Sequence, residues 1–409
     1  MPRFENRRWE ADFSAPGAKK NRRSFTYKAF VPDALEGFAP SLPAATVALV
    51  SDAEQTVQTL NLDPPQLASL EVVARRLLRA EAVASSSIEG LKISQRRLAE
   101  AELGADDARD VTAKSVLGNV AAMDAALELG SSKAALQVSD VLEIHRLLME
   151  STDHPDRAGK LRTTQNWIGG TSYNPLNAVF VPPPPELVES LMEDLVRFAS
   201  RSDLPAAVQA AVAHAQFETI HPFGDGNGRT GRALIHVVLR RRGLTPRFVP
   251  PVSLVLATNA SEYIAGLTAF REGRLTGWLD GFARALRSAA KKSADLARDI
   301  AAMQAAWRQR AGNPRADSSA EGLIVALPAY PVLTAASAAK VLDRSVQAAN
   351  TALAVLENAG VLKQVSLGRR NRAFEAPELL NLVSAFEREL AIPDTGGSPP
   401  RPRHAARRR

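Results

Sequence analysis

The twelve residues from His221 to Arg232 gather side chains that suit phosphate chemistry: His-Pro-Phe-Gly-Asp-Gly-Asn-Gly-Arg-Thr-Gly-Arg. Gly226 and Gly228 let backbone N–H groups turn toward an anion, as in known phosphate-binding loops. Arg229 and Arg232 are three positions apart, so on a helix their guanidinium groups lie on one side and can fork onto phosphate oxygens. The segment therefore predicts a cradle for a phosphate group.

Two further side chains of this segment add reactive groups. Asp225 offers hard carboxylate oxygens, the ligands that Mg²⁺ takes when it also binds phosphates. His221 stands directly before the loop, and an imidazole beside a bound phosphate can take the proton of a hydroxyl nucleophile. The combination predicts a site at which a hydroxyl attacks a phosphate-bearing substrate.

Helices are predicted on both sides of the segment. Apolar residues recur with helical spacing in 210–220, and 233–239 is apolar apart from His236. The segment is then a loop that enters a helix N-terminus, where unpaired N–H groups and a partial positive charge favour anions.

Other kinds of site fit this segment poorly. Gly226, Gly228 and Gly231 match a dinucleotide-binding fingerprint, but no strand is predicted before them, and no acidic residue occurs between Asp225 and Glu262 to hold a ribose. The segment has no P-loop lysine either. A zinc site would need His214 or His236 beside His221, and no metal-ligand spacing links them.

The segment resembles the motif of the Fic family, His-Pro-Phe-x-Asp-Gly-Asn-Gly-Arg-x-x-Arg, at every defining position. Farther out, 162–185 resembles the family's flap, a hairpin that docks the target segment by backbone pairing. Ser85-Ser-Ser-Ile-Glu89-Gly90 resembles the family's inhibitory motif, placed here before the core. The resemblance covers residues 30–290.

This resemblance implies a protein adenylyltransferase, which transfers AMP from ATP to a Tyr, Thr or Ser hydroxyl of a target protein and uses Mg²⁺ (or Mn²⁺). His221 is then the catalytic base, and Asp225 holds the metal ion. The nucleotide-binding residues implied are Gly226, Asn227, Gly228, Arg229, Thr230, Arg232 and Tyr263, with Glu89 as the inhibitory group. The family often lines the adenine pocket with paired tyrosines, whereas this chain has Tyr263-Ile264.

Ser85 and Glu89 are one helical turn apart, so we expect both on one face, with the Glu89 carboxylate forming a bidentate pair with Arg232. The expected partners are ATP, a target protein docked on 162–185, and the chain itself as an acceptor. A homodimer and DNA stay open, and no membrane partner is expected. Two rival functions also stay open: another phosphate-linked transfer or AMP removal by the same fold, and a DNA-binding regulator that senses nucleotide.

Composition bounds the class of protein. The chain has 409 residues, 45% of them apolar, and no cysteine, which excludes disulfides and cysteine nucleophiles. It has no apolar run long enough for a membrane span, and 1–28 lacks the apolar segment of a signal peptide, so we expect a cytoplasmic protein. The net charge of +7 resides in the two tails, 1–28 and 396–409, so it does not indicate a nucleic-acid surface on the body.

The expected fold is mainly α-helical: a helical core with a β-hairpin flap, an N-terminal regulatory helical segment and a small C-terminal winged helix. The predicted divisions are a flexible segment 1–45, a regulatory region 46–110, a catalytic core 111–290, a helix and linker 291–320, a winged helix 321–392 and a disordered basic tail 393–409. The segment 1–45 is expected to be irregular, because it contains Pro16, Pro32, Pro40 and Pro43. One helix of the regulatory region is predicted to begin at Asp63-Pro64-Pro65, and its apolar residues Leu70, Val73, Leu77 and Leu78 recur with helical spacing.

The winged helix could bind DNA or protein. The predicted second helix exposes Arg344, Gln347, Asn350 and Thr351, a face with little positive charge, and specific DNA binding usually needs a larger phosphate-contacting surface. We therefore favour protein docking, while Arg369, Arg370 and Arg372 keep DNA binding open.

Overall fold

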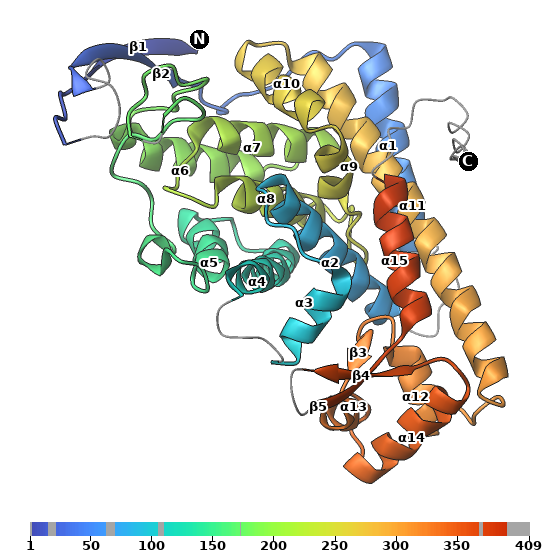
Figure 1. Ribbon diagram of the computed structural model, residues 1–409. Helices are drawn as coiled ribbons and strands as arrows, with labels where there is room; N and C mark the ends of the chain where they lie inside the picture. Colours follow the sequence, from blue (N-terminus) through green and yellow to red (C-terminus); the bar gives the residue numbers. More distant parts are fainter. Residues whose placement is uncertain are drawn as a thin grey trace, which may run out of the picture.

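The computed structural model describes residues 2–14, 22–62, 70–104, 110–171, 173–367 and 371–390. Helices dominate it, as Figure 1 shows. The helices of the N-terminal half are α1 (Ala44–Leu62), α2 (Leu70–Ile88), α3 (Gln95–Glu102), α4 (Val111–Ser131), α5 (Val138–Met149), α6 (Val188–Ala199), α7 (Ala206–Ile220) and α8 (Asn227–Arg241). The later helices are α9 (Val252–Thr258), α10 (Ala260–Arg271), α11 (Leu275–Arg310), α12 (Ser319–Ala326), α13 (Ala335–Leu342), α14 (Val346–Asn358) and α15 (Pro377–Leu390). The strands are β1 (Arg3–Trp9), β2 (Phe25–Val31), β3 (Val332–Leu333), β4 (Lys363–Leu367) and β5 (Asn371–Glu375).

The centre of the molecule is α7, every residue of which is buried. Its many alanines let neighbouring helices approach closely, and α6, α8 and α11 pack against it. The next helix, α8, also contacts α4 and α5, so the loop between α7 and α8 lies among several helices (Figure 1). Helices thus lie on both sides of the loop that begins at His221, as the sequence predicts.

The helix α2 carries the segment that resembles the inhibitory motif. Val73, Leu77 and Leu78 are buried, which confirms the helical periodicity predicted there. The chain leaves the helix through Gly90, whose φ of +83° lies in the left-handed region that glycine adopts readily. The predicted helix start at Asp63-Pro64-Pro65 lies outside the described residues.

The N-terminal segment corrects one prediction. Residues 1–45 were expected to be irregular, but β1 and β2 form an antiparallel hairpin, with Phe4 opposite Phe30. The prolines that suggested irregularity all lie outside the two strands, which alternate between exposed and more buried side chains. The hairpin continues toward the flap, because the Phe30 N–H donates to the Val181 carbonyl at 2.9 Å.

The flap is less regular than a hairpin of two strands. A single antiparallel bridge joins Ile168 and Phe180, in which the Ile168 N–H donates to the Phe180 carbonyl at 2.8 Å. Gly169 and Gly170 have φ of +75° and +74°, and these conformations turn the chain just after the bridge. Trp9 of β1 packs edge-on against Trp167, so the N-terminal hairpin supports the flap.

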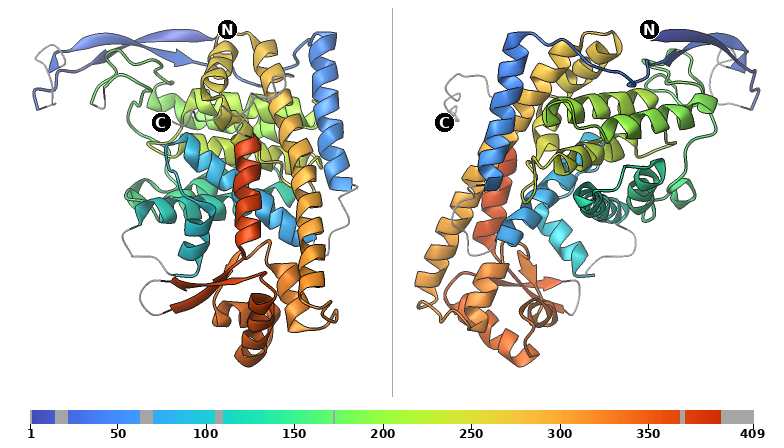
Figure 2. Two further views of the ribbon diagram at one scale, coloured as in Figure 1. Left: turned by 45° about the vertical axis from the view of Figure 1, so that its right-hand side comes forward. Right: turned by 180° about the vertical axis from the view of Figure 1, so that it is seen from behind.

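The C-terminal unit has the order predicted for a winged helix. Helices α13 and α14 precede the hairpin of β4 and β5, and the short β3 completes a sheet of order β3-β5-β4. The helix predicted at the start of 291–320 is the second half of α11, which runs unbroken from Leu275 to Arg310. Figure 2 shows α11 reaching from the core to this unit, with α15 returning beside it. Two of the wing arginines, Arg369 and Arg370, and the tail 393–409 lie outside the described residues.

Polar contacts join the C-terminal unit to α2 and α3. Arg76, only 1% exposed, donates to the Gln95 side chain at 2.7 Å, and Gln95 donates in turn to Glu387 of α15. Arg96 of α3 pairs with Glu375 of β5 at 2.8 Å. The C-terminal unit therefore holds α2 through Arg76, far along the helix from Ser85.

Among the described residues, no helix is both long and apolar enough to cross a membrane.

Candidate active site

His221 stands at the point where α7 ends. Its φ and ψ of 49° and 60° are left-handed, which is unfavourable for a residue with a Cβ and needs support from its surroundings. Its N–H donates to the Phe217 carbonyl at 2.8 Å, and its own carbonyl accepts from Arg162 Nε at 2.9 Å and from Asn166 Nδ2 at 3.1 Å. The flap therefore fixes the backbone of His221 at the end of α7.

The electrostatic setting keeps the His221 imidazole neutral. Burial, together with the positive charges of Arg162 and Arg271, lowers its pKa to about 4. The side chain is nevertheless 19% exposed. At neutral pH the ring is therefore uncharged and accessible, as a base must be.

The loop after His221 is closed by Asn227. The Asn227 side chain accepts from the Phe223 N–H and donates to the Phe223 carbonyl, both at 2.8 Å. The predicted role of Asn227 in the cradle can thus involve only its backbone N–H. Gly226 has φ of +75°, and a Cβ there would lie 3.0 Å from the Met149 sulfur, so both conformation and space require glycine.

The two motif arginines point to different partners. Arg232, 1% exposed, donates from Nε to Ser85 Oγ at 2.9 Å and from Nη2 to the Ser85 carbonyl at 2.8 Å. Arg229 donates from Nη1 to Ser115 Oγ of α4 at 2.8 Å. Their predicted roles as phosphate ligands are not tested by these contacts, but both guanidinium groups are held in fixed positions.

The carboxylate of Glu89 reaches into this site from α2. Glu89 Oε1 accepts from Arg232 Nη2 at 2.7 Å. The same oxygen takes the space in which a Cβ on Gly228 would stand. The predicted contact between Glu89 and Arg232 is confirmed. The predicted bidentate geometry is wrong, because Glu89 contacts only Arg232 Nη2, which also donates to the Ser85 carbonyl, while Nε donates to Ser85 Oγ.

Asp225 is exposed at the tip of the loop. One of its carboxylate oxygens accepts from the Gly226 N–H at 2.6 Å. No group of three or more His, Cys, Asp or Glu side chains that could hold a metal ion occurs among the described residues. A single carboxylate fits Mg²⁺ that takes its other ligands from phosphates and water, and it does not fit a zinc site.

Two histidines considered for zinc have other partners. His214 is fully buried and bonds through Nε2 to the Tyr263 hydroxyl at 2.8 Å. His236 is fully buried as well and lies 2.8 Å from Glu81. Both histidines satisfy interior groups, so the structure gives no support for zinc there.

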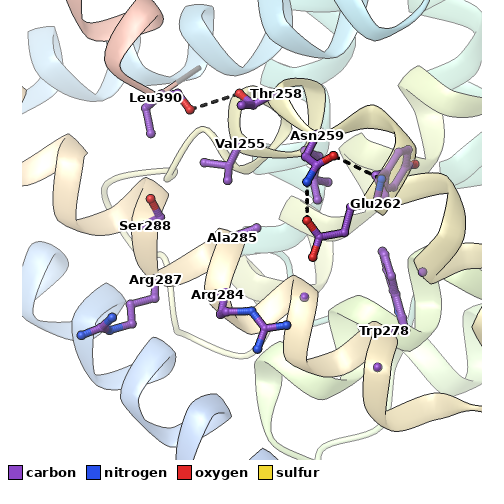
Figure 3. A pocket seen from close by; sticks show the side chains of 15 residues that line it. Val255, Thr258, Asn259, Glu262, Trp278, Arg284, Ala285, Arg287, Ser288 and Leu390 are labelled. Carbon is purple, nitrogen blue, oxygen red and sulfur yellow. Dashed lines mark hydrogen bonds between the residues drawn. The ribbon is translucent and has the colours of Figure 1, made fainter. Parts of the chain in front are cut away.

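Tyr263 lies at the wall of a cavity of about 460 Å³ between α10 and α11. Figure 3 shows Asn259, Glu262, Trp278 and Arg284 around this cavity, with Asn259 bonded to Glu262 as the cap of α10. The Tyr263 hydroxyl faces the interior, where it contacts His214. Thr230, also predicted to bind nucleotide, is 1% exposed within α8. The roles of these two residues toward ATP stay predictions.

A histidine that the sequence does not single out, His145, lies beneath the loop that follows His221. His145 of α5 is fully buried, and its Nδ1 accepts from the Gly159 N–H at 3.0 Å. Its Nε2 therefore carries the proton and donates to the Asp225 carbonyl at 3.0 Å. Nothing in the amphipathic pattern of 138–149 distinguishes this histidine from a core residue, so only the fold reveals that it supports the loop.

Arg162 was recognised only as the start of the flap. Its guanidinium donates to four carbonyls, those of Thr164, Pro183, Ile220 and His221, at 2.6 to 3.3 Å. Burial lowers its pKa to about 10. The arginine thereby ties both arms of the flap to the end of α7.

Comparison with known proteins gives consistent matches. Residues 135–239 match the model of the Fic/DOC family, and residues 47–128 match the model of the Fic/DOC family N-terminal region. Protein adenylyltransferase fic-1 of Caenorhabditis briggsae is 36% identical over 165 residues, which cover 38% of this chain and 29% of that protein. Protein adenylyltransferase Fic of Drosophila persimilis is 28% identical over 256 residues, 59% of this chain and 46% of that protein.

The chain thus spans less than half the length of these curated relatives. Among solved structures, a Fic family protein from Desulfovibrio desulfuricans G20 superimposes with a TM-score of 0.50 at 22% identity, covering 82% of this chain and 97% of that chain. At this identity the likeness concerns the fold, and it confirms the mainly helical architecture predicted from the sequence.

Proposed function

The chain belongs to the Fic/DOC family, and on that premise we propose that it transfers AMP from ATP to a hydroxyl group of a target protein. The observation that carries the proposal is the placement of a neutral, accessible His221 directly before the loop of Gly226 and Gly228 and the buried Arg232. A base, an anion cradle and a fixed cation, gathered in the short stretch from His221 to Arg232, are the groups that such a transfer needs.

In this reaction His221 takes the proton of the target hydroxyl, whose oxygen attacks the α-phosphorus while pyrophosphate leaves in line. The backbone N–H groups at the start of α8 and the Arg229 and Arg232 guanidinium groups would bind the phosphates. An Mg²⁺ ion held by Asp225 would neutralise phosphate charge. Positioning and charge stabilisation supply most of the acceleration in such transfers.

The flap is the proposed dock for the target. Its arms are tied to His221 through Arg162, so a segment paired with the flap would present its hydroxyl beside the imidazole. The N-terminal hairpin supports the flap from the far side. For the C-terminal unit we likewise propose docking of protein rather than DNA. The side chains that α14 exposes at Gln347, Asn350 and Thr351 are uncharged and offer no positive charge to DNA phosphates.

The enzyme in this state is proposed to be inhibited by Glu89. The carboxylate occupies Arg232 and the space over Gly228, so the outer phosphates of ATP would lack their cradle. A cytoplasmic location, which the absence of cysteine favours, stays a prediction.

Labelled ATP tests the proposed function. The full-length Glu89→Gly variant is incubated with ATP labelled at either the α- or the γ-phosphate, in the presence and absence of cell lysate, and protein is separated on a gel. Adenylylation labels protein from α-labelled ATP alone. Label from the γ-phosphate would indicate another transfer, and no label from either, with ATP bound, would favour a nucleotide sensor. Release of AMP from premodified protein would reveal the reverse activity.

A further inference from the structure

Glu218 lies one helical turn before His221, at the end of α7. Its Oε2 is 3.8 Å from His221 Nδ1, and the residue is only 6% exposed. Neither Glu218 Oε1 nor His221 Nδ1 has a hydrogen-bond partner among the described residues, although both atoms are buried. A buried carboxylate and a buried imidazole nitrogen, each with unused capacity, thus face the same small space.

We propose that Glu218 is a positioning residue for His221: its carboxylate keeps the proton on Nδ1, so that Nε2 is free to act as base, and it stabilises the imidazolium that forms during transfer. The inference rests on the proposed function. The separation of 3.8 Å exceeds a hydrogen bond, but contacts between catalytic groups often tighten only when substrate is bound.

The proton balance of the step is simple. The target O–H proton moves to His221 Nε2, a bond forms between the target oxygen and the α-phosphorus, and the bond from that phosphorus to the pyrophosphate oxygen breaks. Pyrophosphate leaves with the electron pair. Nδ1 keeps its proton throughout, and Glu218 neither gains nor loses one, so it contributes charge and orientation only.

The groups around Glu218 come from several helices. Burial, with a smaller contribution from Glu89 just after α2, raises the pKa of the Glu218 carboxyl to about 7, while Arg232 of α8 and Arg271 of α10 oppose this shift. Glu218 Oε1 also lies against Gly231, where a Cβ would come within 2.7 Å of it. The carboxylate is therefore fixed in place, and it carries its full charge only above neutral pH.

The main-chain carbonyl of Glu218 is a second acceptor near the His221 ring, since it acts to raise the pKa of His221 against the effect of burial. A Glu218→Gln substitution keeps the carbonyl and the shape of the side chain and removes only the carboxylate charge. The variant therefore separates the two acceptors.

The test compares full-length Glu89→Gly with Glu89→Gly, Glu218→Gln, measuring kcat and KM for ATP between about pH 6 and about pH 9, the range that spans the titration of a carboxyl with a pKa near neutrality. We expect kcat to fall about 10- to 100-fold, since an opposite charge near a titrating group shifts its pKa by about 1–3 units. KM for ATP should stay unchanged. The rise of kcat with pH through neutrality should disappear, and Glu218→Asp should recover part of the rate.

Asp194→Asn serves as a matched control, because Asp194 is also 6% exposed and accepts from the Leu35 N–H far from the site. This variant is expected to keep the pH profile even if its melting temperature falls. Unchanged kcat and an unchanged pH profile in Glu218→Gln, with a normal melting temperature, would overturn the proposal. If Glu89→Gly itself transfers no AMP, the proposed function has failed instead.

Discussion

Glu89 Oε1 lies 2.7 Å from Arg232 Nη2, so a partly exposed carboxylate on one helix neutralises an almost fully buried guanidinium on another. Although burial opposes its charge, the Glu89 carboxylate raises the pKa of Arg232. The arginine remains charged in either state, and only its partner would change when ATP arrives. The Glu89 carboxylate and the phosphates of ATP would therefore compete for the Arg232 guanidinium.

Replacing Glu89 with glycine should activate the enzyme. Without the carboxylate, Arg232 and the space over Gly228 are free for phosphates, and correcting a misplacement of about 1 Å can raise a rate about 10²-fold. Self-modification with α-labelled ATP measures the gain. The double variant Glu89→Gly, His221→Ala should be silent. Activity of Glu89→Gly no higher than wild type would mean that Glu89 serves the fold or another reaction.

Loss of His221 should abolish transfer and leave ATP binding intact. In the Glu89→Gly background, His221→Ala removes the base, a loss of about 10²–10⁴-fold in rate. Calorimetry measures ATP binding, and label incorporation measures transfer. His154→Ala, a change at an exposed histidine, is the control and should behave as its parent. Transfer at the parent's rate without His221 would refute the mechanism.

Activity should require a divalent cation through Asp225. Asp225→Ala in the activated background should be nearly inactive at ordinary Mg²⁺ levels, because the remaining loop offers no other carboxylate. The exposed Asp203, which pairs with Arg201 at 2.6 Å, supplies the control Asp203→Ala. Equal activity with excess chelator and with Mg²⁺ would rule out the metal role.

Arg162 should be essential for both the flap and the placement of His221. Lysine keeps the charge but cannot donate to four carbonyls from a planar fork, so Arg162→Lys leaves buried acceptors unpaired at about 1–3 kcal/mol each. We expect a lower melting temperature, and a larger fall in modification of a target protein than in ATP binding. A variant with normal stability and normal transfer would contradict this role.

DNA binding by the full chain should be weak and strongly dependent on salt. The exposed face of α14 carries neutral side chains at Gln347, Asn350 and Thr351, and Arg372 of the wing pairs with Glu357. Gel-shift titrations with random and genomic fragments at two salt concentrations measure the affinity. Tight, sequence-specific binding at physiological salt would instead favour the regulator.

The local features of the site could be predicted from the sequence, whereas its long-range contacts could not. The spacing from His221 to Arg232 predicts a phosphate loop, because glycine conformations and helix entry are local properties. The contact of Glu89 with Arg232 joins residues 143 positions apart, and it could be expected only through the family resemblance. The contact of Arg229 with Ser115 depends on how α4 packs on α8, which no local pattern encodes.

The fold shows the same division. Amphipathic helices such as α2 were predictable from the helical spacing of their apolar residues. The N-terminal hairpin was missed because its strands are short and prolines occur near them in the sequence. The full length of α11 was not predicted either, because the hydrogen bonds of a helix continue through changes of composition along the chain.

The contacts between α2 and the C-terminal unit affect how the protein unfolds. Arg76 is buried, and the countercharge of Glu387 that offsets its burial comes from α15. Removal of the chain beyond 312 would strand that guanidinium and uncover Ala99 of α3, which packs on Val332. Core and C-terminal unit should therefore melt in a single cooperative transition, and a chain shortened at this point is a destabilised protein rather than an isolated catalytic module.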